Sequence, residues 1–189
     1  MSEQLVNKND EELLELINKK DHPAFSELVR RYSKKFYAVS YRILGNRDDS
    51  EDMVQDAFLK LWNESDLWES KFETKFTTWF YRVFINQCLD YKRKKGYRNH
   101  DEYEESSMGE HSTGIIMEQK SSNELINKYI MELPEKQQIA LNLCYYENLT
   151  REEAGEIMEL TTKGVQSLVS RAKENLKSKL RKYYKQEAI

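Results

Sequence analysis

Three carboxylates recur at helical spacing in the stretch DDSEDMVQDAFLKLW, which runs from Asp48 to Trp62. Asp49, Asp52 and Asp56 follow an i, i+3, i+7 pattern, so a helix would line them up on one exposed face. The opposite stripe of this helix is apolar and suits a core. A row of acids beside apolar side chains attracts a basic partner and fixes its register, so the stretch predicts a protein-docking surface. The alternative is a solvated acidic face, with Trp62 packed in the core.

A second set of side chains suits contact with nucleic acid, in the stretch FTTWFYRVFINQCLDYKRKK. Aromatic and amide residues are followed there by a dense basic run. Single strands are held by basic grooves together with aromatic contacts to unstacked bases. The candidate residues are Trp79, Tyr81, Asn86, Lys92, Arg93 and Lys94. The alternative for the aromatics is burial in the core, because they too lie at helical spacing.

The third set lies near the C-terminus, where Glu174 is the only acid between Lys163 and Lys185. Thr150 and Glu153 form a capping-box pattern for a short helix, which a tight turn and a long basic helix follow. This is the helix-turn-helix layout, whose second helix enters the major groove. The candidates for base contact are Lys163, Gln166, Ser167, Ser170 and Arg171, and those for backbone contact are Lys173 and Lys177. The alternative is a solvated basic surface.

Residues for covalent or metal chemistry are sparse. Cys88 and Cys144 are isolated, and the 3 histidines form no ligand cluster with them. We therefore expect buried thiols in a reducing compartment, no metal, no cofactor and no enzymatic activity. A signal-peptide pattern and an apolar run of membrane-spanning length are both missing, so a cytoplasmic protein without membrane insertion is expected.

The elements that position these residues should all be helices. The chain of 189 residues has only 6 glycines and 2 prolines, and it lacks the alternation of strands. Helices are predicted over residues 9–19, 21–45, 48–62, 76–95, 122–131, from Pro134 onward, from Thr150, and over 161–184. Residues 64–75 are predicted to form a loop that carries Trp68 and Phe72. The net charge of −3 conceals strong local segregation of acid and base, so it does not argue against DNA binding.

A change of composition divides the chain into two small helical domains. Residues 97–121 are rich in Ser, Gly, Glu and His, which is typical of a flexible linker. The fold class is therefore predicted as all-α, with one domain over residues 1–96, a linker over 97–121, and a helix-turn-helix domain over 122–189.

The order of these parts resembles the extracytoplasmic-function (ECF) class of bacterial sigma factors in the sigma-70-like family. Three stretches carry the resemblance: DDSEDMVQDAFLKLW, FTTWFYRVFINQCLDYKRKK and LPEKQQIALNLCYYENLTREEAGEIMELTTKGVQSLVSRAKENL. They are similar to the polymerase-binding helix of region 2, to the helix of that region that melts the promoter and reads the minus-ten element, and to region 4, which reads the minus-35 element.

The resemblance implies a transcription initiation factor that binds core RNA polymerase, at its β′ coiled coil and its β subunit, and promoter DNA. An anti-sigma factor is a further expected partner. The implied polymerase-binding residues are Asp49, Asp52, Gln55, Asp56, Leu59 and Trp62. The resemblance assigns the second set of residues to the minus-ten single strand and the third set to the minus-35 duplex.

The chain departs from the family pattern in the region 4 stretch. Leu168 stands where the family often has Arg, and Ala154-Gly155 replaces a larger pair. Glu159 stands where the turn commonly has Gly, and a positive φ at this position would cost Glu about 1 kcal/mol.

Three other function classes compete with a sigma factor. A polymerase-independent helix-turn-helix regulator would not require the acidic row. An anti-sigma or scaffold protein would lack the basic recognition helix. A helical enzyme would need a nucleophile, a phosphate loop or a metal site.

Overall fold

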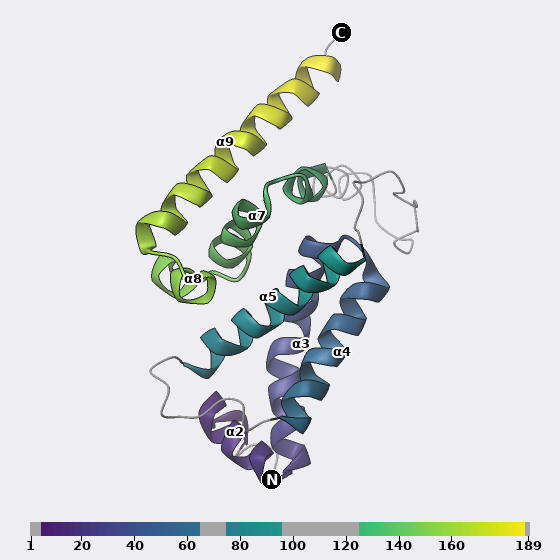
Figure 1. The fold of residues 1–189 in the computed structure, drawn as a ribbon, viewed down its shortest axis with the longest axis vertical. Coiled ribbons are helices and arrows are strands. Elements are labelled where there is room, and N and C mark those ends of the chain that lie inside the picture. Colours follow the sequence, from purple (N-terminus) through teal and green to yellow (C-terminus); the bar gives the residue numbers. More distant parts are fainter. Residues whose placement is uncertain (1–4, 65–74, 96–124, 188–189) are drawn as a thin grey trace.

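The structure, a computed structural model, describes residues 5–64, 75–95 and 125–187 of the chain. The regular structure in these ranges is helical throughout, which confirms the all-α prediction (Figure 1). The helices are α2 (Asp10–Asn18), α3 (His22–Leu44), α4 (Arg47–Asn63), α5 (Phe76–Lys94), α7 (Glu135–Leu141), the π-helical turn η2 (Asn142–Tyr146), α8 (Arg151–Met158) and α9 (Thr162–Glu187). Residues 125–131 are helical as well.

Local capping signals fix the ends of several helices. The Asp21 side chain accepts a hydrogen bond from the Ala24 N–H at 2.8 Å, and Pro23 lies in the first turn of α3. Gly45 ends α3 in the left-handed conformation, with φ 76°. The capping box of Thr150 and Glu153 begins α8, as predicted.

The N-terminal helices pack around a cluster of aromatic rings. Phe36 of α3 is fully buried and stacks on Phe84 of α5, with 4.3 Å between the ring centroids. Phe80 of α5 lies 4.7 Å from the same ring, and Phe58 of α4 approaches it at 6.1 Å. These contacts hold α3, α4 and α5 together and so fix which faces of α4 and α5 remain exposed.

In the C-terminal part, α9 packs against α7 and α8 through one apolar stripe. Val165, Val169 and Ala172 are buried, while Leu168 is half-buried. The turn between α8 and α9 has Glu159 in the left-handed conformation, with φ 55° and ψ 42°. The turn therefore keeps the geometry that favours glycine, with Glu in its place.

The two halves of the molecule are in contact (Figure 1). Helix α8 packs against α5, and α7 and α8 lie between α9 and α5. One continuous apolar cluster joins buried residues of both halves, from Phe36 and Phe84 to Leu143 and Ile157. The predicted linker of residues 97–121 and the predicted loop carrying Trp68 and Phe72 lie outside the described residues. The division into domains at that linker stays a prediction.

Candidate functional site

The acidic face of α4 is narrower than the spacing predicts. Asp52, Gln55, Asp56 and Leu59 are exposed. Asp49 is buried, so its predicted place on the exposed face is wrong. Its carboxylate Oδ1 accepts hydrogen bonds from the Tyr91 hydroxyl and from the Lys95 Nζ atom, each at 2.6 Å.

The position of Asp49 explains this difference. It lies in the first turn of α4, where the C-terminal end of α5 passes close by. The hydrogen bond to Asp49 raises the pKa of Lys95 above its ordinary value. Asp49 thus contacts α5 of its own chain, and any role of it in docking a partner stays a prediction.

Leu59 lies beside the remaining acids as an apolar group on a polar face. Its side chain is 58% exposed, the largest exposed fraction among the exposed large apolar residues of the described chain. It follows Asp52 by seven positions and Asp56 by three, so the three share one face of α4. An apolar residue rimmed by charges is typical of a protein-protein interface.

Trp62 is half-buried at the C-terminal end of α4. Its ring stacks on His22 at 4.6 Å and meets the edge of Phe25 at 5.1 Å. The Lys20 ammonium lies 5.2 Å from the same ring. The indole therefore packs within its own domain and also presents an accessible part beside the exposed face of α4.

The predicted minus-ten residues of α5 fall into two groups. Asn86 and Lys94 are exposed, and Trp79 is half-buried against Phe76, with 5.9 Å between the ring centroids. The other three predicted residues, Tyr81, Lys92 and Arg93, contact residues outside α5.

Tyr81, Lys92 and Arg93 each have a partner outside α5. Tyr81 is buried and donates a hydrogen bond to Glu147 at 2.9 Å, and burial raises the pKa of its hydroxyl above the ordinary range. The Lys92 ammonium donates to the Ile43 carbonyl at 2.8 Å, and burial lowers its pKa. Arg93 is exposed and pairs with Glu135 at 2.9 Å.

The predicted minus-35 residues share one exposed face of α9. These exposed residues are Lys163, Gln166, Ser167, Ser170, Arg171, Lys173 and Lys177. Their spacing places them opposite the buried stripe that packs on α7 and α8. The Lys173 ammonium lies 4.6 Å from the Tyr145 ring, which leaves it at the edge of this face. The face is polar and basic, and the major groove of DNA is wide enough to admit an α-helix.

The two cysteines, both in the described part of the chain, differ in their burial. Cys88 is buried, and burial raises its pKa to about 12, so it stays a protonated thiol. Cys144 is only half-buried, which is less than predicted. Within residues 5–64, 75–95 and 125–187, side chains that could ligate a metal do not gather in threes. In the same ranges, none of the helices has the length and apolar character to cross a membrane.

The sequence patterns gave no indication of one set of interacting residues. Arg42 of α3 contacts Asn142, Tyr146 and Glu147, about a hundred positions further along the chain. Because these partners lie so far apart in the sequence, no local pattern could have indicated their contacts.

The family models and curated relatives agree on one class of protein. The model of sigma-70 region 2 matches residues 28–98, and that of sigma-70 region 4 matches residues 123–176. The chain is 30% identical to the ECF RNA polymerase sigma factor SigW of Bacillus subtilis, over 87% of this chain and 93% of the relative. It is 29% identical to the ECF RNA polymerase sigma-E factor of Escherichia coli K12, over 95% of this chain and 97% of the relative. The chain therefore belongs to the ECF class of the sigma-70 family, whose members direct RNA polymerase to promoters.

Two solved structures share the fold. CnrH, in complex with the cytosolic domain of CnrY, aligns with a TM-score of 0.68 at 19% identity, over 91% of this chain and 97% of CnrH. The sigma factor RpoE of Bartonella quintana, in complex with the anti-sigma factor NepR, aligns with a TM-score of 0.61 at 21% identity, over 83% of this chain and 96% of RpoE. At these identities the likeness concerns the fold.

Proposed function

We propose that this chain binds core RNA polymerase through α4 and reads promoter DNA through α5 and α9. The observation that carries the proposal is the separation of three faces of different chemistry on one chain, of which those of α4 and α9 are exposed. The face of α4 is acidic with an apolar centre, α5 carries aromatic, amide and basic groups, and the face of α9 is polar and basic. Each face suits a different partner.

The docking step is assigned to Asp52, Gln55, Asp56 and Leu59 of α4. Their carboxylates steer a basic helical surface such as the β′ coiled coil, and Leu59 supplies apolar area at the centre of the contact. The β subunit is a further contact surface of the polymerase. Asp49 contributes indirectly by fixing α4 against α5.

The DNA steps are assigned to α9 and α5. The exposed face of α9 enters the major groove of the minus-35 duplex, with Arg171 and Gln166 reaching base edges and Lys177 a phosphate. Asn86 and Lys94 of α5 contact the minus-ten single strand, together with other residues of that helix. The protein performs no covalent chemistry in this scheme, since the polymerase makes the RNA. Its place of action is the cytoplasm.

An anti-sigma factor is the proposed regulator. Two of the solved structures that share this fold are complexes, one with the cytosolic domain of CnrY and one with an anti-sigma factor. These complexes support, by analogy, a partner of the same kind for this chain.

Run-off transcription with purified core polymerase tests the proposal. Addition of the chain should yield a promoter-specific transcript that core polymerase alone does not make. The rival function, a polymerase-independent helix-turn-helix regulator, predicts a specific footprint on duplex DNA without polymerase and no gain of transcript.

Charge reversal on α4 tests the docking residues. Asp52→Lys or Asp56→Lys should weaken binding to core polymerase, and the helical circular-dichroism signal should not change. Glu15→Lys is the matched control, because Glu15 is an exposed acid on α2, away from α4's acidic face. Equal binding by all three variants would contradict the assignment.

A further inference from the structure

The first turn of α5 lacks the local signals that usually stabilise the start of a helix. Lys75, at the N-cap position, forms no side-chain cap, and the first turn carries no acid. The first N–H groups of a helix have no partner within it, and its N-terminal end carries a partial positive charge. The start of α5 therefore needs hydrogen-bond acceptors and negative charge from another element.

Two carboxylates of α2 supply what the start of α5 lacks. The Phe76 N–H donates a hydrogen bond to the Glu11 Oε1 atom at 3.3 Å, and the Thr77 hydroxyl donates to the Asp10 Oδ2 atom at 3.4 Å. Figure 1 shows α2 beside the start of α5, and the two helices are in contact. Asp10 and Glu11, called the α2 cap below, thus stabilise a helix that begins about 65 positions further along the chain.

Asp10 is itself held in place from α3. Its Oδ1 atom accepts a hydrogen bond from the Arg31 guanidinium at 2.8 Å, and its Oδ2 atom accepts one from the Tyr32 hydroxyl. Burial, together with the hydrogen bond to Asp10, raises the pKa of Tyr32 above its ordinary value, so the hydroxyl stays protonated and keeps donating. Only 15% of the Asp10 side chain is exposed, so its charge depends on these partners.

Arg31 fastens the segment before α2 to the same network. Its guanidinium donates to the carbonyl groups of Leu5, Val6 and Lys8 at 3.2, 2.9 and 2.8 Å, and it pairs with Glu27 at 2.8 Å. The apolar side of α2 is buried in the core of region 2. α2 is therefore a fixed base for the first turn of α5.

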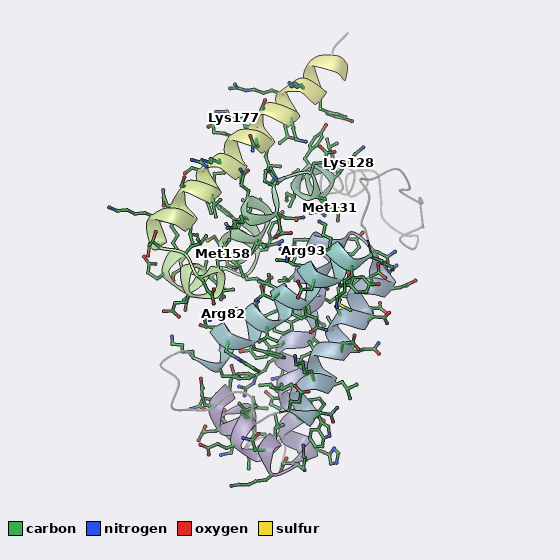
Figure 2. All side chains as sticks on the ribbon, in the orientation of Figure 1. Arg82, Arg93, Lys128, Met131, Met158 and Lys177 are labelled. Atoms are coloured by element: carbon green, nitrogen blue, oxygen red, sulfur yellow. The ribbon has the colours of Figure 1, made fainter. Side chains whose placement is uncertain are left out.

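The first turn of α5 determines where the residues assigned to the minus-ten strand lie. Phe76 is fully buried, and Trp79 is half-buried one turn further on, with 5.9 Å between the two ring centroids. Asn86 follows Trp79 by seven positions, so the two share one face of α5. Figure 2 shows Arg82 and Arg93 further along α5, on the side toward the C-terminal helices, whereas the first turn contacts α2.

We propose that Asp10 and Glu11 are positioning residues for minus-ten reading, because they hold the first turn of α5 in the conformation that presents Trp79 to the single strand. A preformed turn spares the strand the cost of ordering it, which favours binding. The two acids act through α5 and make no contact with the strand. The α2 cap stands on the contacts alone, whereas its effect on strand reading rests on the proposed function.

Hydrogen–deuterium exchange of the free full-length chain, followed by mass spectrometry, tests the α2 cap. Asp10→Ala and Glu11→Ala should each speed exchange in the peptide that covers the first turn of α5, because this turn would fray more often. The rate should rise about fivefold, the effect of removing roughly one capping interaction. Glu11→Gln keeps an acceptor oxygen and should exchange more slowly than Glu11→Ala. Unchanged exchange in both alanine variants would overturn the cap.

Strand binding by the reconstituted holoenzyme tests the positioning role. The probe is a fluorescent single-stranded oligonucleotide with the minus-ten sequence of a promoter that the wild-type holoenzyme transcribes, and anisotropy measures its binding. Asp10→Ala and Glu11→Ala should bind it about fivefold more weakly, because affinity falls with the fraction of chains in the competent conformation. Removal of an acid would by itself favour an anionic strand, so a loss identifies misplacement of α5. Affinity for a minus-35 duplex should not change.

Asp21→Ala distinguishes positioning from general stability. The Asp21 side chain caps α3, so its loss destabilises region 2 and leaves the first turn of α5 with its acceptors. This variant should bind the strand as the wild type does, and so should Glu15→Ala, which removes an exposed acid of α2. Thermal unfolding shows whether each variant is folded at the temperature of the binding measurement. A loss of affinity in Asp21→Ala as large as that in Glu11→Ala would refute the positioning role.

The outcomes separate this inference from the proposed function. Faster exchange without a loss of strand affinity would overturn the positioning role and leave the α2 cap as a structural feature. Absence of strand binding by the wild-type holoenzyme would contradict the proposed function and the positioning role together, whereas the exchange result would still decide the cap.

Discussion

Asp49 and Lys95 join the start of α4 to the end of α5, with 2.6 Å between the Asp49 Oδ1 atom and the Lys95 Nζ atom. The Tyr91 hydroxyl donates to the same oxygen at 2.6 Å. Asp52, one turn further along α4, is exposed. Asp49 and Asp52 belong to one sequence pattern but have different roles. Asp49 stabilises the packing of α4 against α5, whereas Asp52 faces solvent.

Asp49→Ala should lower the free energy of unfolding by about 1.5 to 3 kcal/mol, the range for a hydrogen bond to a charged group. Most of the loss comes from Tyr91, whose hydroxyl would lose its acceptor in a half-buried place. The half-exposed Lys95 adds little, because water solvates it when the pair is broken. Urea denaturation measures the change.

The matched control for that variant is Asp52→Ala. It should change stability by less than about 0.5 kcal/mol, as exposed positions usually do. Equal destabilisation by the two variants would contradict the distinction between the two acids.

Glu27 of α3 should contribute to stability in a pH-dependent manner. The hydrogen bond from Arg30, together with that from Arg31, lowers the pKa of Glu27 from 4.5 to about 2. Because the folded-state pKa lies below the unfolded one, the stabilisation is complete above about pH 4.5 and is lost as the pH falls toward about 2. The thermal midpoint of Glu27→Gln should lie below that of the wild type at neutral pH, and the two should converge in acid.

Glu15→Gln is the control for this pH profile, since Glu15 is exposed. Its midpoint should follow that of the wild type at every pH. Parallel curves for Glu27→Gln and the wild type would show that the Glu27 interactions do not stabilise the fold.

Gly155 of α8 leaves room for the turn of the helix-turn-helix. A Cβ atom at this position would lie 2.7 Å from the Leu160 carbonyl oxygen, which belongs to the backbone. Gly155→Ala should therefore destabilise the chain by about 1 to 3 kcal/mol, as overpacking does, and reduce minus-35-dependent transcription. Thermal unfolding and run-off transcription measure the two effects.

Gly164→Ala is the control variant, which distinguishes this steric clash from the effect that any glycine-to-alanine substitution has on stability. The new Cβ atom would meet the Thr161 Oγ1 atom at 3.3 Å, a side-chain contact near the start of α9. Alanine also favours the helix by up to about 1 kcal/mol. A loss as large as that of Gly155→Ala would refute the steric explanation.

The helix ends were predictable because their signals are local. Asp21 with Pro23, and Thr150 with Glu153, satisfy backbone donors within one turn of their own helix. The left-handed Gly45 terminates α3 by the same local logic. These signals need no knowledge of how the helices pack.

The place of Asp49 was not predictable from spacing. Periodicity tells which residues share a face, but it does not tell which neighbouring helix passes over one end of that face. The contacts of Arg42 with η2 and Glu147 join residues about a hundred positions apart, so no local pattern encodes them. The solvent-exposed faces of α4 and α9 were otherwise predicted well, because few of the other described helices pack against them.

Arg171 of α9 should carry sequence discrimination, while Lys177 should carry affinity alone. Both are exposed on one face, but Arg171 lies closer to the start of the helix, the end that enters the groove. Arg171→Ala should cost about 1 to 3 kcal/mol on the cognate minus-35 duplex and less on mutated sites. Lys177→Ala should weaken all duplexes alike and reduce the dependence of affinity on salt by about one counterion. Anisotropy titrations of the reconstituted holoenzyme at several salt concentrations measure both. If Arg171→Ala lost affinity equally on every duplex, this arginine would be a backbone contact, and the reading of the minus-35 element would pass to Gln166 and its neighbours nearer the turn.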